Sequence, residues 1–161
     1  MVTLPAAVPV TAAPSAPVAA GGLRRDDLPG TVLYVEDNES NIQLVEQLLA
    51  LRPRVKLLVA RDSTSARVLA AVTQPDIVLV DMRLPDASGI DVLHALRAQA
   101  HTERLACIAV SANALPEDIA AARAAGFDDY LTKPLTAEHF LARIDAALAR
   151  PAPAALARSA G

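Results

Sequence analysis

The apolar run from Asp76 to Val80, which stops at Asp81, is the feature that most constrains how this chain folds. Consecutive Ile, Val and Leu residues are typical of a strand in a parallel sheet whose two faces are both buried. Ligands of such sheets bind at the carboxyl ends of the strands, so Asp81 is expected to line a site. The alternative is that Asp81 only terminates the strand or caps the turn that follows it.

Three other strand-like runs also end in polar or charged residues, which favours a site over a simple strand end. These runs are Thr31 to Val35, followed by Glu36 and Asp37; Leu105 to Val110, followed by Ser111; and Phe127 to Thr132, followed by Lys133 and Pro134. Parallel strands bring their carboxyl ends to one edge of a sheet. All of these groups are therefore expected close to Asp81.

Helical patterns alternate with the strands along the chain. The expected helices are Ser40 to Leu51, Ser63 to Val72, Gly89 to Gln99, Leu115 to Ala125 and Ala137 to Ala149, and a further strand is expected from Arg54 to Ala60. This alternation predicts an α/β fold, a doubly wound five-stranded parallel sheet with helices on both faces. Periodicity does not determine the strand order, but the flavodoxin-like order 2-1-3-4-5 is common and opens a crevice between the first and third strands.

Composition limits the classes of partner. A chain of 161 residues with 53% hydrophobic content and a net charge of -3 can bury the core of one domain. A pI near 5.5 without clusters of Lys or Arg argues against direct binding of nucleic acid. No apolar stretch approaches the ~20 residues of a membrane span. Cys107 is the single cysteine, which fits a reducing cytoplasm, so a cytoplasmic protein away from the membrane is expected.

The two ends of the chain differ in composition from its middle. Residues 1–28 are rich in Pro and Ala and are expected to form a flexible leader or linker, and 151–161 a flexible tail. The compact domain is expected at 29–150. A secretory signal is the rival interpretation of the leader, but no Lys or Arg precedes its apolar part and prolines interrupt it.

Three carboxylates, those of Glu36, Asp37 and Asp81, would repel one another in one crevice unless some are protonated or a cation lies among them. Oxygen ligands without nearby His or Cys favour Mg²⁺, which keeps waters and binds phosphate oxygens. Lys133 offers a positive charge and Ser111 a hydroxyl group to a phosphoryl group. Asp81, at the centre, is placed to accept that group as a nucleophile.

Four segments of the chain resemble the signature blocks of one family, the receiver domains of two-component response regulators. The segments are Val32 to Asn38, Asp76 to Gly89, Ala109 to Ala112 and Asp128 to Pro134, in the usual order of that family. Each block alone carries little information, but the four at these spacings are highly specific. The resemblance covers Thr31 to about Leu148.

The resemblance implies a role for each residue of the acidic crevice. Asp81 would be phosphorylated by a phosphohistidine, carried by a histidine kinase or a histidine phosphotransfer protein. Asp37 would bind Mg²⁺ directly and Glu36 largely through water. The backbone carbonyl of Arg83 would complete the protein ligands of the metal.

The same resemblance assigns the groups that contact the phosphoryl group. Lys133 would pair with the phosphoryl oxygens, and its bond to Pro134 is expected to be cis. Ala112 is small, as the site requires beside the phosphoryl group.

Phosphorylation adds negative charge, and nearby hydrogen-bond donors can move towards it, so an electrostatic switch is expected. Ser111 would turn towards the phosphoryl group, and Tyr130 would follow it inward as the switch aromatic. The bistable element would comprise the loop after Ser111, the Ala-rich helix from Leu115 to Ala125, and Tyr130.

The expected function is therefore that of a phosphoacceptor with at most slow self-dephosphorylation, and not that of an enzyme. No output domain is expected in this chain, because only Pro151 to Gly161 follow the last helix. A stand-alone regulator and the terminal receiver of a hybrid histidine kinase are both open.

Two other functions are compatible with an acidic crevice of this kind. A Mg²⁺-dependent phosphatase could use Asp81 in an aspartyl-phosphate intermediate, but such enzymes usually carry a second acid two residues later, where this chain has Arg83. A degenerate receiver that acts only as a binding module is disfavoured because the five functional residues are all present. They are Glu36, Asp37, Asp81, Ser111 and Lys133.

Overall fold

The structure, a computed structural model, describes residues 28–149, and the predicted leader and tail lie, apart from Leu28, outside the described residues. Five strands alternate with five helices in this part of the chain, as predicted. The strands are β1 (Gly30–Val35), β2 (Val55–Ala60), β3 (Ile77–Asp81), β4 (Ala106–Ser111) and β5 (Asp129–Thr132). The helices are α1 (Glu39–Leu49), α2 (Ser63–Thr73), α3 (Gly89–Arg97), α4 (Pro116–Ala125) and α5 (Ala137–Ala149).

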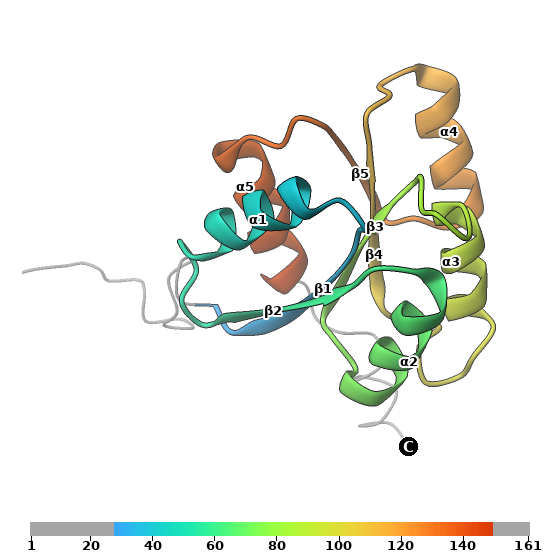
Figure 1. Cartoon of the computed structure of the whole chain (residues 1–161), viewed down its shortest axis with the longest axis horizontal. Helices are drawn as coiled ribbons and strands as arrows, with labels where there is room; N and C mark the ends of the chain where they lie inside the picture. The colour runs from blue at the N-terminus through green and yellow to red at the C-terminus, as the bar shows by residue number, and fades with distance from the viewer. Residues whose placement is uncertain (1–27, 150–161) are drawn as a thin grey trace, which may run out of the picture.

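The strands form one parallel sheet in the order β2-β1-β3-β4-β5, which confirms the predicted topology. Figure 1 shows α1 and α5 on one face of this sheet and α2, α3 and α4 on the other. The register places Val35 beside Val80, Asp81 beside Val110, and Ser111 beside Thr132. The carboxyl ends of β1, β3, β4 and β5 therefore meet at one edge.

Each face of the sheet carries its own apolar core. Side chains alternate along a strand, so Ile77 and Leu79 pack under α1 and α5, whereas Val78 and Val80 pack under the other three helices. Every residue of β3 is buried. Asp81 thus lies at the end of a strand that is packed between two apolar cores.

Local signals explain where several helices begin and end. Asn38 caps the start of α1, where its side chain accepts a hydrogen bond from the amide of Asn41. Pro116 lies in the first turn of α4, and Gly126, with φ of 120°, ends that helix. The strand predicted from Phe127 begins only at Asp129, because the amide of Phe127 still donates to Ala122 in the last turn of α4.

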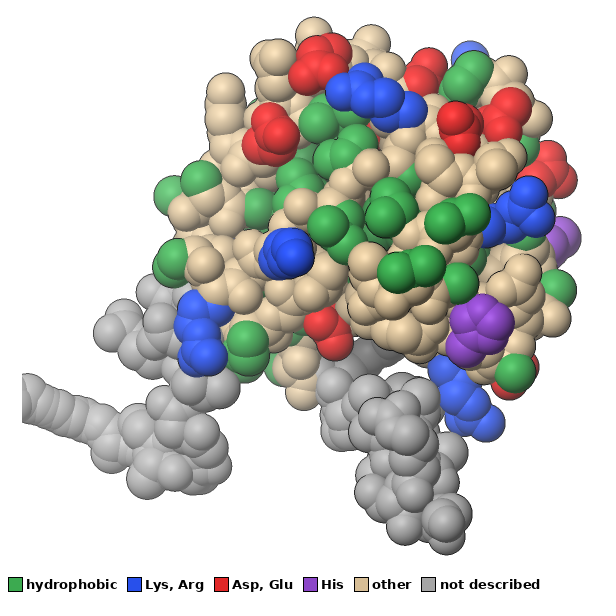
Figure 2. Space-filling view, turned by 60° about the horizontal axis from the view of Figure 1, so that its bottom comes forward, with side chains coloured by type: hydrophobic (Ala, Val, Ile, Leu, Met, Phe, Trp, Pro, Cys, Tyr) green, Lys and Arg blue, Asp and Glu red, His purple; other side chains and the backbone are tan. Residues whose placement is uncertain are grey.

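Charged side chains are mixed on the surface. On the face that Figure 2 shows, Lys and Arg side chains are scattered among Asp and Glu instead of being gathered into one basic patch. Within residues 28–149, no helix has the length and apolar character that a membrane span requires.

Candidate functional site

The three predicted acids meet at the carboxyl edge of the sheet. One carboxylate oxygen from each of Glu36, Asp37 and Asp81 lies within 4.8 Å of the other two. Glu36 and Asp81 are buried, whereas Asp37 is exposed. Glu36 and Asp37 directly follow β1, and Asp81 ends the neighbouring strand β3, so the strand order itself brings the acids together.

Lys133, which directly follows β5, supplies the cation of this cluster. Its Nζ lies 3.0 Å from Oε1 of Glu36 and 3.5 Å from Oδ2 of Asp81. Its backbone amide donates a 2.7 Å hydrogen bond to the carbonyl of Ser111, which fixes the end of β5 against β4. The bond between Lys133 and Pro134 is cis, as predicted. One ammonium group faces three acids, so the cluster keeps a net negative charge.

Glu36 is the most densely hydrogen-bonded group of the cluster. Its Oε1 accepts from Tyr34 Oη at 2.8 Å and from Asn41 Nδ2 at 3.2 Å, in addition to Lys133. Its Oε2 accepts from the amide of Asn38 at 3.2 Å. Burial alone would raise the pKa of Glu36, but the hydrogen bonds from Asp81, Tyr34 and Lys133 outweigh it and hold the pKa below its ordinary value.

Asp81 has the opposite electrostatic balance. Burial, and then the hydrogen bond and negative charge of Glu36, raise the pKa of Asp81 from its ordinary value of 3.8 to about 6. The amide of Arg83 donates to Oδ1 of Asp81 at 3.1 Å. Because the donors gather on Glu36, Asp81 takes up a proton before Glu36 does, and a pKa of about 6 leaves Asp81 mostly ionised at neutral pH.

The loop between β3 and α3 folds tightly over the end of β3. The amide of Gly89 donates to the carbonyl of Met82 at 3.1 Å. A Cβ added at Gly89 would lie 2.9 Å from Cα of Met82 and 3.0 Å from the carbonyl oxygen of Asp81. Glycine is therefore required at position 89 by the close approach of two backbone segments.

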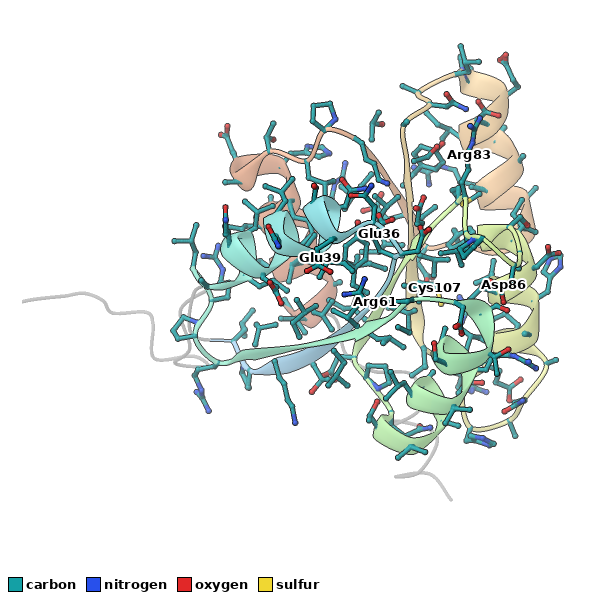
Figure 3. All side chains as sticks on the ribbon, viewed as in Figure 1. Glu36, Glu39, Arg61, Arg83, Asp86 and Cys107 are labelled. Carbon is teal, nitrogen blue, oxygen red and sulfur yellow. The ribbon has the colours of Figure 1, made fainter. Side chains whose placement is uncertain are left out.

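The same loop is tied to α2 at its outer side. The carboxylate of Asp86 accepts hydrogen bonds from the amide of Ser63 at 3.1 Å and from its hydroxyl group. Nearby, Arg61 and Glu39 form an exposed ion pair of 2.6 Å between β2 and α1. Figure 3 labels Asp86, Arg61 and Glu39 together with Glu36 and Arg83. Arg83 and Asp86 share the loop after β3, whereas Arg61 follows β2 and Glu39 begins α1.

The two predicted switch residues are connected through a third residue. The amide of Asn113 donates to Oγ of Ser111 at 3.1 Å, and Oη of Tyr130 donates to the carbonyl of Asn113 at 2.9 Å. Ser111 and Tyr130 are both buried. The ring that was expected to move inward on phosphorylation already lies inward in this structure. Within α4, Ala122 is the buried residue, so this helix buries no large side chain.

Sequence reasoning missed Tyr34, Asn41 and Asn113. A signal for Tyr34 was available, because residues two apart in an extended segment point to the same side, and Glu36 follows Tyr34 by two. No local signal identified Asn41, whose side chain reaches Glu36 only because α1 turns back over the end of β1. Asn113 acts through its backbone groups, which every residue type shares.

Comparisons with known proteins agree with this geometry. A family model described as the response regulator receiver domain matches residues 32–145. DivK, a polar-differentiation response regulator of Brucella anthropi, is 32% identical over 117 residues, which are 73% of this chain and 94% of DivK. TcrX, a probable transcriptional regulatory protein of Mycobacterium tuberculosis, is 38% identical over 127 residues, 79% of this chain. Those residues are 53% of TcrX, so the chain spans about half the length of that relative.

Solved structures share the fold. The receiver domain of the sensor histidine kinase PA1611 from Pseudomonas aeruginosa superposes with a TM-score of 0.69 and 30% identity, covering 76% of this chain and 99% of that one. It was solved with a magnesium ion coordinated in its active-site cleft. A putative response regulator from Chloroflexus aurantiacus gives a TM-score of 0.71 with 25% identity over 76% of this chain and 99% of that one.

Proposed function

This chain belongs to the response regulator receiver domains, the phosphoryl-accepting modules of two-component signalling, and from that premise we propose that Asp81 is its phosphoacceptor. The observation that carries the proposal is the meeting of Glu36, Asp37, Asp81 and Lys133 from the ends of β1, β3 and β5. Asp81 ends the central strand β3 and is ionised at neutral pH, as a nucleophile must be.

The residues present fit a magnesium ion. The cluster consists of carboxylate oxygens, and its net negative charge is suited to a hard divalent cation. Glu36, Asp37 and Asp81, with the backbone carbonyl of Arg83, would hold Mg²⁺. When bound, the ion would neutralise these carboxylates and the phosphoryl oxygens.

The transfer step is a displacement at phosphorus. A carboxylate oxygen of Asp81 attacks the phosphoryl group of a phosphohistidine, and the phosphorus–nitrogen bond breaks as the oxygen–phosphorus bond forms. The electron pair of the broken bond returns to the imidazole nitrogen, which takes up a proton. The donor is a histidine kinase or a histidine phosphotransfer protein, as the family membership supports.

The switch follows from the change of charge at Asp81. Lys133 moves its ammonium group from Glu36 towards the phosphoryl oxygens, since these carry the larger negative charge. The hydroxyl group of Ser111 turns to the same oxygens and releases the amide of Asn113. Tyr130, whose hydroxyl group is bound to Asn113, carries the change to the start of α4.

We assign this activity to residues 29–150 and expect at most slow loss of the phosphoryl group. Ala112 lies next to Ser111 and leaves space for the phosphoryl group. The position two residues after Asp81 is Arg83, which cannot activate a water as a second acid would. Direct binding of nucleic acid, insertion into a membrane and enzymatic turnover form no part of this proposal.

The test is to incubate the protein with Mg²⁺ and acetyl phosphate and to measure its intact mass. The parent should gain one phosphoryl group, and Asp81→Asn should gain none. Asp91→Asn, which changes an exposed acid at the start of α3, should be modified as the parent is. Equal labelling of Asp81→Asn would overturn the assignment, and sustained release of phosphate from a phosphomonoester would favour the phosphatase.

A further inference from the structure

Tyr34 is a buried tyrosine whose hydroxyl group serves the acidic cluster. Its relative exposure is 0%, and its neighbours Val32, Leu33 and Val35 in β1 are aliphatic. The ring packs in the core beneath α1 and α5, a role that a phenylalanine could fill. The hydroxyl group adds one feature to this packing, the 2.8 Å hydrogen bond to Oε1 of Glu36.

This hydroxyl group is a permanent donor. Its oxygen lies 2.8 Å from a carboxylate oxygen, which can only accept, so the phenol is the donor of this buried hydrogen bond. A buried phenol needs a hydrogen-bond partner, and no buried side-chain oxygen or nitrogen lacks one among the described residues. Tyr34 therefore keeps its proton and directs it at Glu36.

The two oxygens of Glu36 are not equally available. Oε1 accepts from Tyr34 at 2.8 Å, from Lys133 at 3.0 Å and from Asn41 at 3.2 Å. Oε2 accepts from the amide of Asn38 at 3.2 Å. A carboxylate oxygen offers about two lone-pair directions, so three donors saturate Oε1. Only Oε2 has capacity left for a cation or for the water of a cation.

We propose that Tyr34 is a positioning residue that restricts Glu36 to a single-oxygen contact with a bound cation, and that it thereby makes the site prefer Mg²⁺ over Ca²⁺. Ca²⁺ takes six to eight oxygens and readily binds a carboxylate through both, whereas Mg²⁺ demands near-octahedral geometry and keeps waters. A Glu36 with one free oxygen suits the coordination of Mg²⁺, but it cannot give Ca²⁺ the two-oxygen contact. The inference rests on the proposed function, because it presumes the metal site.

Tyr34 would act entirely through Glu36. Loss of its hydroxyl group would remove the shortest hydrogen bond on Oε1, the one whose donor is held in the core. The remaining donors, Lys133 and Asn41, are only partly buried and hold the oxygen less firmly. Glu36 could then turn and offer both oxygens to the larger ion. The expected signature is a change in the ratio of two metal affinities, which a purely structural hydroxyl group would not alter.

The experiment compares three variants with the parent by calorimetric titration of Mg²⁺ and Ca²⁺. Tyr34→Phe keeps the ring and removes the hydroxyl group. Asn41→Ala removes a second donor from the same oxygen without changing the core. Thr102→Val is the matched control, because it removes a buried hydroxyl group that lies away from the acids. This hydroxyl group donates to the carbonyl of Leu96 at 2.6 Å in the turn after α3.

The ratio of the calcium Kd to the magnesium Kd should fall by about tenfold in Tyr34→Phe, a usual size for changes behind a metal ligand. It should fall by less in Asn41→Ala and stay unchanged in Thr102→Val. An unchanged ratio in both Tyr34→Phe and Asn41→Ala, with Mg²⁺ still binding the parent, would overturn the inference. A parent that binds no Mg²⁺ would instead overturn the proposed metal site.

Discussion

The ammonium nitrogen of Lys133 lies 3.0 Å from Oε1 of Glu36, so the cation and the most buried acid of the cluster are already paired. The same nitrogen lies 3.5 Å from Asp81. Lys133 therefore stands between the residue that would bind metal and the residue that would bind the phosphoryl group. The charges of the three side chains are coupled, and a change to one alters the energetics of the others.

Removal of the lysine should destabilise the protein. Lys133→Met would leave two buried carboxylates without their cation, and we expect the free energy of unfolding at neutral pH to fall by about 1–3 kcal/mol. The cost is limited because Asp81 can take up a proton. Urea unfolding followed by circular dichroism measures it. The loss should shrink when Mg²⁺ is added, since the metal would neutralise the same carboxylates.

Arg143→Met is the control for this prediction. Arg143 pairs with Asp129 at 3.2 Å, but its side chain is 45% exposed, so its removal should cost at most about 1 kcal/mol. Equal losses in the two variants would show that burial of the acidic cluster does not matter.

Neutralisation of Asp81 should stabilise the metal-free protein. The pKa of Asp81 is about 6 in the folded chain and 3.8 ordinarily, so the folded chain binds the proton more tightly than the unfolded one. The resulting destabilisation is fully present above pH 6 and is lost as the pH falls towards 3.8. Asp81→Asn should therefore raise the free energy of unfolding by about 1–3 kcal/mol at pH 7.5.

The same gain should nearly vanish at pH 4, where the folded parent is already protonated at Asp81. Glu138→Gln is the control, because Glu138 is exposed in the first turn of α5, where its charge favours the helix. This variant should lower the free energy of unfolding, by less than about 1 kcal/mol. A gain in Asp81→Asn that is independent of pH would contradict the assignment of the raised pKa.

A methyl group at position 89 should disturb the proposed metal site through the backbone. Gly89→Ala would force Cβ against Cα of Met82 and the carbonyl oxygen of Asp81, and the loop that carries Arg83 must then shift. We expect a loss of about 1–3 kcal/mol and weaker binding of Mg²⁺ by calorimetry. In Gly30→Ala the new Cβ would meet the end of the Leu148 side chain, which can move. That variant should bind Mg²⁺ as the parent does, and a Gly89→Ala protein that did the same would refute the prediction.

The hydroxyl group of Tyr130 should hold the loop between β4 and α4. Tyr130→Phe removes the 2.9 Å hydrogen bond to the carbonyl of Asn113, at a cost of about 0.5–1.5 kcal/mol. Amide hydrogen exchange in residues 111–116 should become faster, because α4 buries little and cannot hold the loop alone. Thr102→Val, with a similar loss of one buried hydroxyl group, should leave exchange in this loop unchanged.

Much of the fold could be predicted because its signals are local. The run before Asp81 is apolar at every position, which is typical of a strand buried on both faces, and β3 is buried throughout. The end of α4 followed from Gly126, whose positive φ suits glycine. The strand at Phe127 was placed too early because its apolar side chain packs in the core while its backbone still closes the helix.

The sequence by itself determined which chemical groups lie at the carboxyl edge, because alternating strands and helices deliver the end of each parallel strand to the same side. Only the tertiary structure decided how those groups are bonded. Tyr34, Asn41 and Lys133 converge on one oxygen of Glu36 because β1, α1 and the end of β5 pack against one another. A hydrogen bond depends on distances of a few tenths of an ångström between separate elements, and periodicity carries no information on that scale.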